Sequence, residues 1–218
     1  MPFPMTHLHI AYNILSNTPQ IKKPCDFMLG AIAPDSVHFR DNYVSDMKKI
    51  SHLCAGNEKW GMVTNNQEWL ENVLSFLEEN KDTEKADFIY GYCSHILADI
   101  QNNIKIWMPF QLENKEALEK GMGSIYHQES NNVDYALYLL QPQQKIIWEI
   151  LKDANGYDIQ NVVDLREINE MKDTILRSQF IDREDVDMSS NKYVTLSNMQ
   201  KFISVESQYI RKLLYQND

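Results

Sequence analysis

The chain lacks the features that mark secreted, membrane-spanning and disulfide-stapled proteins. Its 218 residues contain only three cysteines. Cys25, Cys54 and Cys93 form neither an even framework nor a Cys-x-x-Cys pair, which fits a reducing compartment. No apolar run approaches the roughly 20 residues that a membrane-spanning helix needs. The N-terminus also lacks the basic start and apolar core of a signal peptide. We therefore expect a cytoplasmic protein without a transmembrane segment.

Positive charge is scarce as well. The chain has 21 Lys and Arg against 31 Asp and Glu, a formal net charge of -10 at pH 7. This balance argues against the broad basic surface that a nucleic-acid duplex or an anionic membrane would require. It does not exclude a phosphorylated ligand held through divalent cations, because bound cations reverse the charge locally. There is also no Gly/Pro/Ser-rich linker and no internal repeat, so residues 1–218 are expected to form a single domain.

Alternating strand patterns are scarce too, and the helical period dominates. We therefore predict an all-α domain of about seven helices. Pro142 is expected to break one helical stretch near Gln141. The predicted helical segments are 5–16, 64–80, 84–107, 132–153, 159–180 and the C-terminal stretch from Leu196.

Two of these segments carry sequence signals at their starts. Thr64 with Gln67, and Ser197 with Gln200, have the spacing of capping boxes. The segments 17–63 and 108–130 show no periodicity and are predicted to be irregular connections. Connections of this length inside a compact domain are often functional.

The most informative pattern is His95 and Asp99, one helical turn apart on the same face of a mostly apolar segment. An imidazole and a carboxylate need partners when they are buried. Both bind Zn²⁺, so a transition metal is a natural partner. The pair supplies only two ligands, and further ones must come from elsewhere in the chain.

All six histidines lie within the first 127 residues, which confines any histidine-based site to that part. His7 and His9 lie roughly 200° apart around a helix, so only one can face an interior site. We favour His7, and expect His9 to be exposed or hydrogen-bonded to a neighbour. Asp35 follows Pro34 on a stiff turn, which suits a metal ligand, although an Asp there also suits a helix cap.

The remaining candidates are individually ambiguous. His52 follows the basic, exposed-looking Met47-Lys-Lys and could be an ordinary loop histidine. The segment from Tyr126 offers His127, Glu129 and Asp134 near a helix start. Asp134 there could equally complement the helix dipole, and His127 could be a surface residue.

Taken together and in order, these pieces resemble the zinc-dependent phospholipase C family over about residues 1–140. The matching stretches are Thr6-His7, Asp26-Phe-Met-Leu-Gly-Ala-Ile-Ala-Pro-Asp35, Ser51-His-Leu and Tyr90-Gly-Tyr-Cys-Ser-His95-Ile-Leu-Ala-Asp99. The resemblance implies an all-helical fold with a zinc cluster that hydrolyses phosphoesters. It also implies that His7, Asp35, His52, His95 and Asp99 are metal ligands, with Asp99 bridging between ions.

The resemblance does not supply every ligand. The family's further His and His-x-x-x-Glu ligands have no clean match, and Asp134 is our choice to complete the site. We expect one to three Zn²⁺ ions, with one or two favoured, and Fe²⁺ or Mn²⁺ as alternative metals.

The predicted activity is hydrolysis of a small phosphodiester or phosphomonoester by a metal-activated water. Asp35 is expected to bind metal and to orient or deprotonate the water. His38 is expected to contact the substrate or to protonate the leaving oxygen, although it could equally be an ordinary loop histidine. His127 and Glu129 are assigned to substrate binding. The sequence leaves the oligomeric state undetermined.

Two other classes were weighed. An HD-type phosphohydrolase needs an adjacent His-Asp dipeptide, and this chain has none. A helical binding protein that retains a structural metal but has lost catalysis stays open. A structural zinc site is closed by four protein ligands, whereas a catalytic site keeps an open position.

Overall fold

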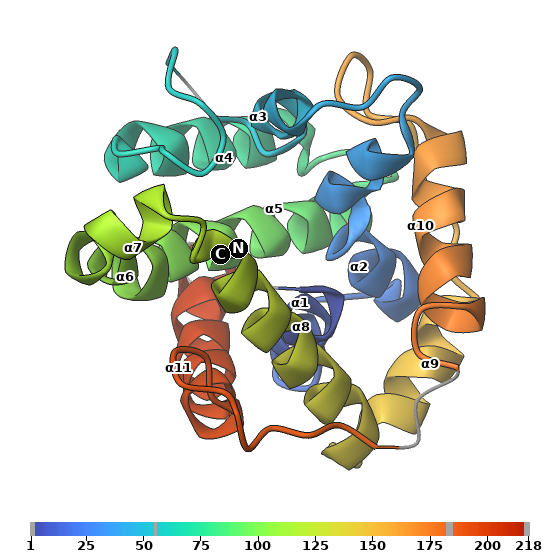
Figure 1. The fold of residues 1–218 in the computed structure, drawn as a ribbon. Helices are drawn as coiled ribbons and strands as arrows, with labels where there is room; N and C mark the ends of the chain where they lie inside the picture. The colour runs from blue at the N-terminus through green and yellow to red at the C-terminus, as the bar shows by residue number, and fades with distance from the viewer. Residues whose placement is uncertain (1–2, 55, 182–184, 216–218) are drawn as a thin grey trace.

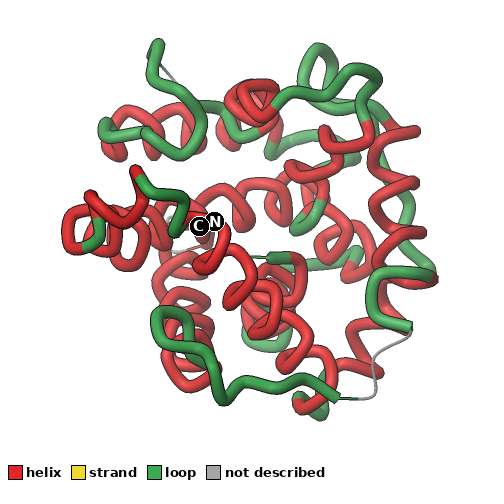
Figure 2. The backbone as a smooth tube through the Cα atoms, viewed as in Figure 1, coloured by secondary structure: helices red, strands yellow, loops and turns green. Residues whose placement is uncertain are grey.

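The structure is a computed structural model that describes residues 3–54, 56–181 and 185–215. Within these ranges the chain forms eleven α-helices and no strand, and a single isolated bridge joins Ile159 to Val163. Figure 2 shows these helices joined by loops and turns. The prediction of an all-α fold is confirmed, with more helices than expected.

The long predicted helices are present with shifted ends. They are α1 (Pro4–Leu15), α4 (Asn66–Asn80), α5 (Ala86–Asn102), α8 (Gly123–Leu140), α9 (Gln144–Lys152), α10 (Leu165–Arg177) and α11 (Leu196–Tyr215). A π-helical turn, Asn103–Trp107, continues α5. The break at Pro142 is confirmed, since α8 ends at Leu140 and α9 begins at Gln144.

The two stretches predicted to be irregular are instead built from short helices, and that prediction was wrong. They contain α2 (Pro24–Gly30), α3 (Lys48–Ser51), α6 (Met108–Glu113), α7 (Lys115–Glu119) and two 3₁₀ turns, Ala33–Phe39 and Ser45–Met47. The first turns of α8 also fall within the second stretch. Helices of one or two turns are too short to show a hydrophobic period.

The predicted capping residues are displaced by one or two positions. Asn65, and not Thr64, caps α4 by accepting the Glu68 N–H at 3.2 Å. At α11, the Thr195 hydroxyl accepts the Asn198 N–H at 3.3 Å. Both starts still use a short polar side chain to satisfy a free N–H of the first turn.

Helix α5 is the central element of the fold. It crosses the middle of the molecule between α4 on one side and α1 and α8 on the other (Figure 1). It contacts α1, α2, α4 and α11, and from Gly91 to Asn102 every residue is buried. A polar residue in this part of α5 therefore has no access to bulk water.

Two glycines let α2 and α5 meet at backbone contact. A Cβ on Gly30 would lie 2.1 Å from the carbonyl oxygen of Phe88, and a Cβ on Gly91 would lie 2.0 Å from that of Phe27. Both positions therefore exclude every other residue type unless the helices move apart. This contact fixes the turn after α2 against the middle of α5, where the candidate ligands lie.

Candidate metal centre

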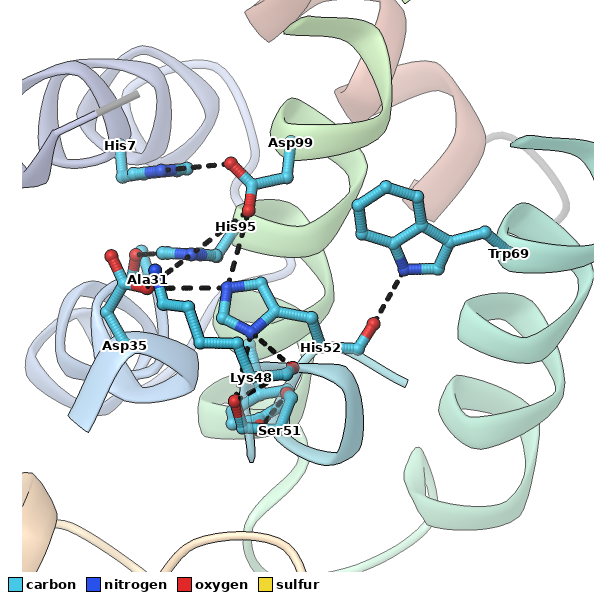
Figure 3. A network of polar contacts seen from close by, with 10 residues as sticks. His7, Ala31, Asp35, Lys48, Ser51, His52, Trp69, His95 and Asp99 are labelled. Atoms are coloured by element: carbon cyan, nitrogen blue, oxygen red, sulfur yellow. Dashed lines mark hydrogen bonds and ion pairs between the residues drawn. The ribbon is translucent and has the colours of Figure 1, made fainter. Parts of the chain in front are cut away.

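Four segments that are distant in sequence bring five predicted ligands together (Figure 3). Helix α5 supplies His95 and Asp99 one turn apart, and α1 supplies His7. Asp35 comes from the 3₁₀ turn after α2, and His52 directly follows α3. The three imidazoles and Asp99 are at most 2% exposed, and Asp35 is 7% exposed.

Asp99 lies between the imidazoles. Its Oδ1 is 3.5 Å from His7 Nε2, and its Oδ2 is 3.3 Å from His52 Nε2. On the other side of His52, Asp35 Oδ1 lies 3.4 Å from the same Nε2. The Nε2 of His95 is 4.0 Å from Asp35 Oδ1 and 3.9 Å from Asp99 Oδ2. The two carboxylates and the imidazoles thus face a shared interior space.

Contacts behind two imidazoles hold their Nε2 atoms toward this space. His95 Nδ1 lies 2.8 Å from the carbonyl oxygen of Ala31. His52 Nδ1 lies 3.0 Å from the carbonyl oxygen of Lys48 and 2.9 Å from the Ser51 hydroxyl. A carbonyl accepts only, so the proton resides on Nδ1 and each Nε2 presents a lone pair. This is the usual support behind a metal-binding histidine.

The cluster leaves several buried polar atoms without a hydrogen bond. Among the described residues, both ring nitrogens of His7, the Nε2 of His52 and of His95, and both carboxylate oxygens of Asp99 have no hydrogen-bond partner. A buried polar atom left unpaired costs about 1–3 kcal/mol. Lone pairs of this kind, converging from imidazole and carboxylate, fit a divalent cation of the zinc type.

Two overlapping sets of ligand atoms are close enough to hold an ion. One is His7, His95 and Asp99, and the other is Asp35, His52 and His95, with the atoms of each set within 4.8 Å of one another. His95 belongs to both, but only its Nε2 is free of a backbone contact. One ion can therefore use His95, and Asp99 offers one oxygen toward each set.

The protonation states suit metal binding. Burial lowers the pKa of His7 to about 3 and also lowers that of His95, so both imidazoles are neutral at pH 7. Burial opposes ionisation of Asp99, but its contacts with His52 and the other imidazoles hold its pKa at about 2. Burial opposes a charge on His52, but its contacts with Asp35 and Asp99 raise its pKa. The site therefore combines neutral imidazole at His7 and His95 with ionised carboxylate, the forms that bind metal.

A cavity of about 540 Å³ opens beside the cluster. Asp35, alone among the five clustered residues, lines it. Aromatic and neutral polar side chains make up most of the wall. The lining residues are Phe3, Pro4, Asp35, His38, Phe39, Tyr43, Ser45, Lys48, Trp60, Gly61, Trp107, Gly123, Tyr126, His127, Ser130, Met171, Thr174 and Gln179.

His38 and His127 lie on the cavity wall and outside the ligand cluster. The ring of His38 meets Tyr43 edge-on, and the ring of His127 contacts Phe3. Burial lowers the pKa of His38 to about 4. His9 is buried, so the expectation that it is exposed was wrong. Its ring forms a hydrogen bond with the backbone of Leu137 on α8.

Glu129 and Asp134 have other partners, which corrects two sequence-based expectations. The Glu129 carboxylate accepts the backbone N–H groups of Lys192, Tyr193 and Val194 at 2.7–2.9 Å, and it does not line the cavity. Asp134 accepts the Met5 N–H at 2.8 Å and belongs to neither set of ligand atoms. Glu129 thus anchors a loop and Asp134 caps the start of α1.

The sequence analysis did not identify one residue of the site, Lys48. Lys48 looked exposed within Met47-Lys-Lys but is only 7% exposed, and its Nζ lies 2.6 Å from Asp35 Oδ1. The available signal was its spacing, since it precedes His52 by four residues and shares a helical face with it. Burial disfavours the charge of Asp35, but Lys48 together with His52 and His95 outweighs this effect and holds the pKa of Asp35 well below its usual value.

A buried His/Asp cluster beside an open cavity is compatible with a metal centre in an all-helical protein. Residues 6–101 match the sequence model of a family described as zinc dependent phospholipase C. The chain is thus similar to this family over residues 6–101, a region that contains all five clustered residues. No curated protein and no solved structure matches the chain.

Proposed function

We propose that this protein hydrolyses a small phosphodiester at a zinc centre formed by His7, Asp35, His52, His95 and Asp99. The similarity of residues 6–101 to the zinc dependent phospholipase C family supports the reaction class. The observation that carries the proposal is the set of unpaired buried lone pairs that converge from four segments. Unpaired polar atoms destabilise an apolar core, whereas one or two bound divalent cations would pair with all of them.

The geometry favours two ion positions. Asp35, His52 and His95 would hold the first ion with three ligands, which leaves a position for water beside the cavity that Asp35 lines. His7 and Asp99 Oδ1 would hold a second ion with fewer protein ligands. Zinc supplies Lewis acidity, which makes water nucleophilic near neutral pH and stabilises charge on phosphoryl oxygens.

Asp35 and His38 have distinct roles in this proposal. Asp35 belongs to the cluster and also lines the cavity, so its carboxylate can orient the attacking water toward a substrate there. His38 also lines the cavity, but burial lowers its pKa to about 4. A neutral imidazole is a poor proton donor at pH 7, so we assign His38 to substrate contact rather than to protonation of the leaving group.

The cavity argues for catalysis over a purely structural metal. A structural site is enclosed by protein ligands, whereas here one member of the cluster opens onto a space of about 540 Å³. That volume lies in the range of pockets for small molecules.

None of the helices in the described part of the chain has the length and apolarity needed to cross a membrane.

The proposal is tested by metal analysis followed by an activity panel. Purified protein is stripped with a chelator, reloaded with Zn²⁺, Mn²⁺ or Fe²⁺, and assayed on chromogenic phosphodiesters and phosphomonoesters. We expect stoichiometric zinc and activity on diesters. The His95→Ala variant should lose both, and His9→Gln, a buried histidine outside the cluster, should keep both. Wild-type protein that binds no transition metal refutes the proposal.

A further inference from the structure

The cavity beside the cluster has an unusual charge distribution for so acidic a protein. Among the described residues that line it, Lys48 carries the one permanent positive charge and Asp35 the one carboxylate. His38 and His127 also line it, and burial lowers the pKa of both. Any anionic group that enters the cavity therefore meets one fixed cation.

Lys48 is held at the boundary between the cluster and the cavity. Its Nζ is 2.6 Å from Asp35 Oδ1 and lies over the Trp60 ring, 5.3 Å from its centroid. His52 contacts the same Trp60 ring at 4.6 Å between centroids. The ammonium is therefore enclosed by one carboxylate and one aromatic face, both at the cavity wall.

The oxygen that Lys48 contacts is also the one nearest the candidate ligands. Asp35 Oδ1 lies 3.4 Å from His52 Nε2 and 4.0 Å from His95 Nε2. A cation bound among these three atoms would take over Asp35 Oδ1 and repel the ammonium. Lysine has a flexible four-carbon stem, so its head can move toward the cavity while its backbone stays in α3.

The charge balance shows what Lys48 would add. Asp35 and Asp99 bring two negative charges, and metal-bound imidazoles are neutral. One divalent ion therefore just cancels the carboxylates, and the site would have no net attraction for an anionic phosphodiester. With Lys48 the site carries one net positive charge, directed at the cavity. The effect of Lys48 is thus largest when the site holds a single ion.

We propose that Lys48 is the substrate-binding cation of this site: it pairs with Asp35 in the metal-free protein and binds a phosphoryl oxygen of the substrate once metal occupies Asp35. This inference rests on the proposed metal centre and adds a residue to it. The ligand class is a phosphate monoester or diester anion, recognised by one ammonium together with the metal. Lys48 then supplies a positive charge at a site whose two carboxylates a single divalent ion would only neutralise.

The test separates metal binding from phosphate binding. Zinc affinity is measured by competition with a chromophoric chelator, and inorganic phosphate is titrated into zinc-loaded protein by calorimetry. In Lys48→Met we expect phosphate affinity to fall about tenfold or more, the size of one lost charge-assisted hydrogen bond. Zinc affinity should stay equal or rise, because a competing cation has been removed from Asp35.

Three further variants make the result decisive. Lys49→Met is the matched control, because the Lys49 ammonium donates to the Glu58 carbonyl oxygen and does not line the cavity. It should bind zinc and phosphate like the wild type. Lys48→Arg keeps the charge and should retain more phosphate affinity than Lys48→Met. Lys48→Gln replaces Lys48→Met if the latter does not fold, as judged by circular dichroism.

The outcomes distinguish the two proposals. Wild-type protein without zinc binding refutes the metal centre itself. If the wild type binds zinc and phosphate and the neutral Lys48 variant keeps phosphate affinity within about twofold, well below the loss expected for a charge-assisted contact, the role of Lys48 is refuted while the metal centre stands. Loss of zinc and phosphate together would assign Lys48 a structural role and overturn the inference as well.

Discussion

The contact between α2 and α5 gives a prediction whose size follows from the coordinates. In Gly91→Ala the new Cβ would lie 2.0 Å from the Phe27 carbonyl oxygen and 3.2 Å from the Ala31 nitrogen. A carbon and a carbonyl oxygen approach to about 3.3 Å in ordinary contacts. The helices must therefore separate by about 1 Å or more, because the obstacle is backbone and cannot change rotamer.

The expected loss of stability is the difference between two effects. Forcing an extra methyl group into a packed core costs about 1–3 kcal/mol, occasionally more. Alanine is the better helix former by about 1 kcal/mol. Since the obstacle is rigid backbone, we take the upper part of the first range and expect a net loss of about 2 kcal/mol. For a chain of this size that lowers the Tm by about 4–8 °C.

The same substitution should weaken zinc binding. Helix α2 leads into the turn that carries Asp35, and His95 lies one helical turn after Gly91. The contact between His95 Nδ1 and the Ala31 carbonyl oxygen crosses this same interface at 2.8 Å. Separating the helices moves one ligand away from the other, so zinc affinity should fall along with stability.

The assay is thermal and urea unfolding of zinc-free protein, followed by zinc competition. Gly123→Ala is the matched control, because its Cβ would meet only the Leu118 Cδ2 atom at 3.8 Å. We expect that variant to match or slightly exceed the wild type in Tm. A Gly91→Ala variant with wild-type Tm and zinc affinity would refute the claim that backbone contact between α2 and α5 positions the site.

Four further predictions concern the metal and the buried acids. Removing zinc with a chelator should lower the Tm, and zinc at about 100 times its Kd should restore about 2.7 kcal/mol of stability, as scanning calorimetry would record. His7→Leu should weaken zinc binding but stabilise the zinc-free protein in urea unfolding, because it removes two unpaired buried nitrogens. Glu129→Ala should destabilise the protein by about 2 kcal/mol through the loss of charge-assisted bonds to three backbone N–H groups, with zinc content unchanged by elemental analysis. Burial raises the pKa of Asp134 well above its ordinary value in the folded protein, although hydrogen bonds from the N–H groups of Met5 and Thr6 act to lower it. Wild-type stability therefore falls as pH rises through that pKa. Asp134→Asn should gain stability relative to the wild type between pH 5 and 8, and parallel pH profiles of the two proteins would contradict this.

The sequence singled out the five residues that the structure brings together, but it missed the short helices around them. His95 and Asp99 lie one turn apart in a strongly periodic segment, so their shared face followed from the helical repeat alone. The grouping of these two with His7, Asp35 and His52 followed from a family resemblance and not from periodicity. The α2–α5 contact places Asp35 near His95 and Asp99, and the contacts of α1 with α5 and of α3 with the turn Ala33–Phe39 add His7 and His52. No local pattern in the sequence encodes these contacts.

The errors have a common physical origin. Asp134 and Glu129 were assigned to the site because acids near a helix start look available, yet both are used to satisfy backbone N–H groups from distant segments. Lys48 was taken as exposed because lysine is rarely buried without a partner, and its partner, Asp35, lies thirteen residues earlier. Long-range pairing decides the role of each of these charges, and a single sequence does not reveal such pairs.

The unpaired atoms of the cluster are compatible with a bound cation. Each unpaired buried polar atom destabilises the folded state by about 1–3 kcal/mol. The free energy of unfolding of a natural protein is only about 5–15 kcal/mol. The described part of the chain leaves both nitrogens of His7, both oxygens of Asp99 and the Nε2 of His52 and His95 without hydrogen bonds. Lys48 offsets part of this cost through its ion pair with Asp35, but the atoms of His7 and Asp99 still have no hydrogen-bond partner. We therefore expect added zinc to stabilise the protein mainly by pairing the atoms of His7 and Asp99.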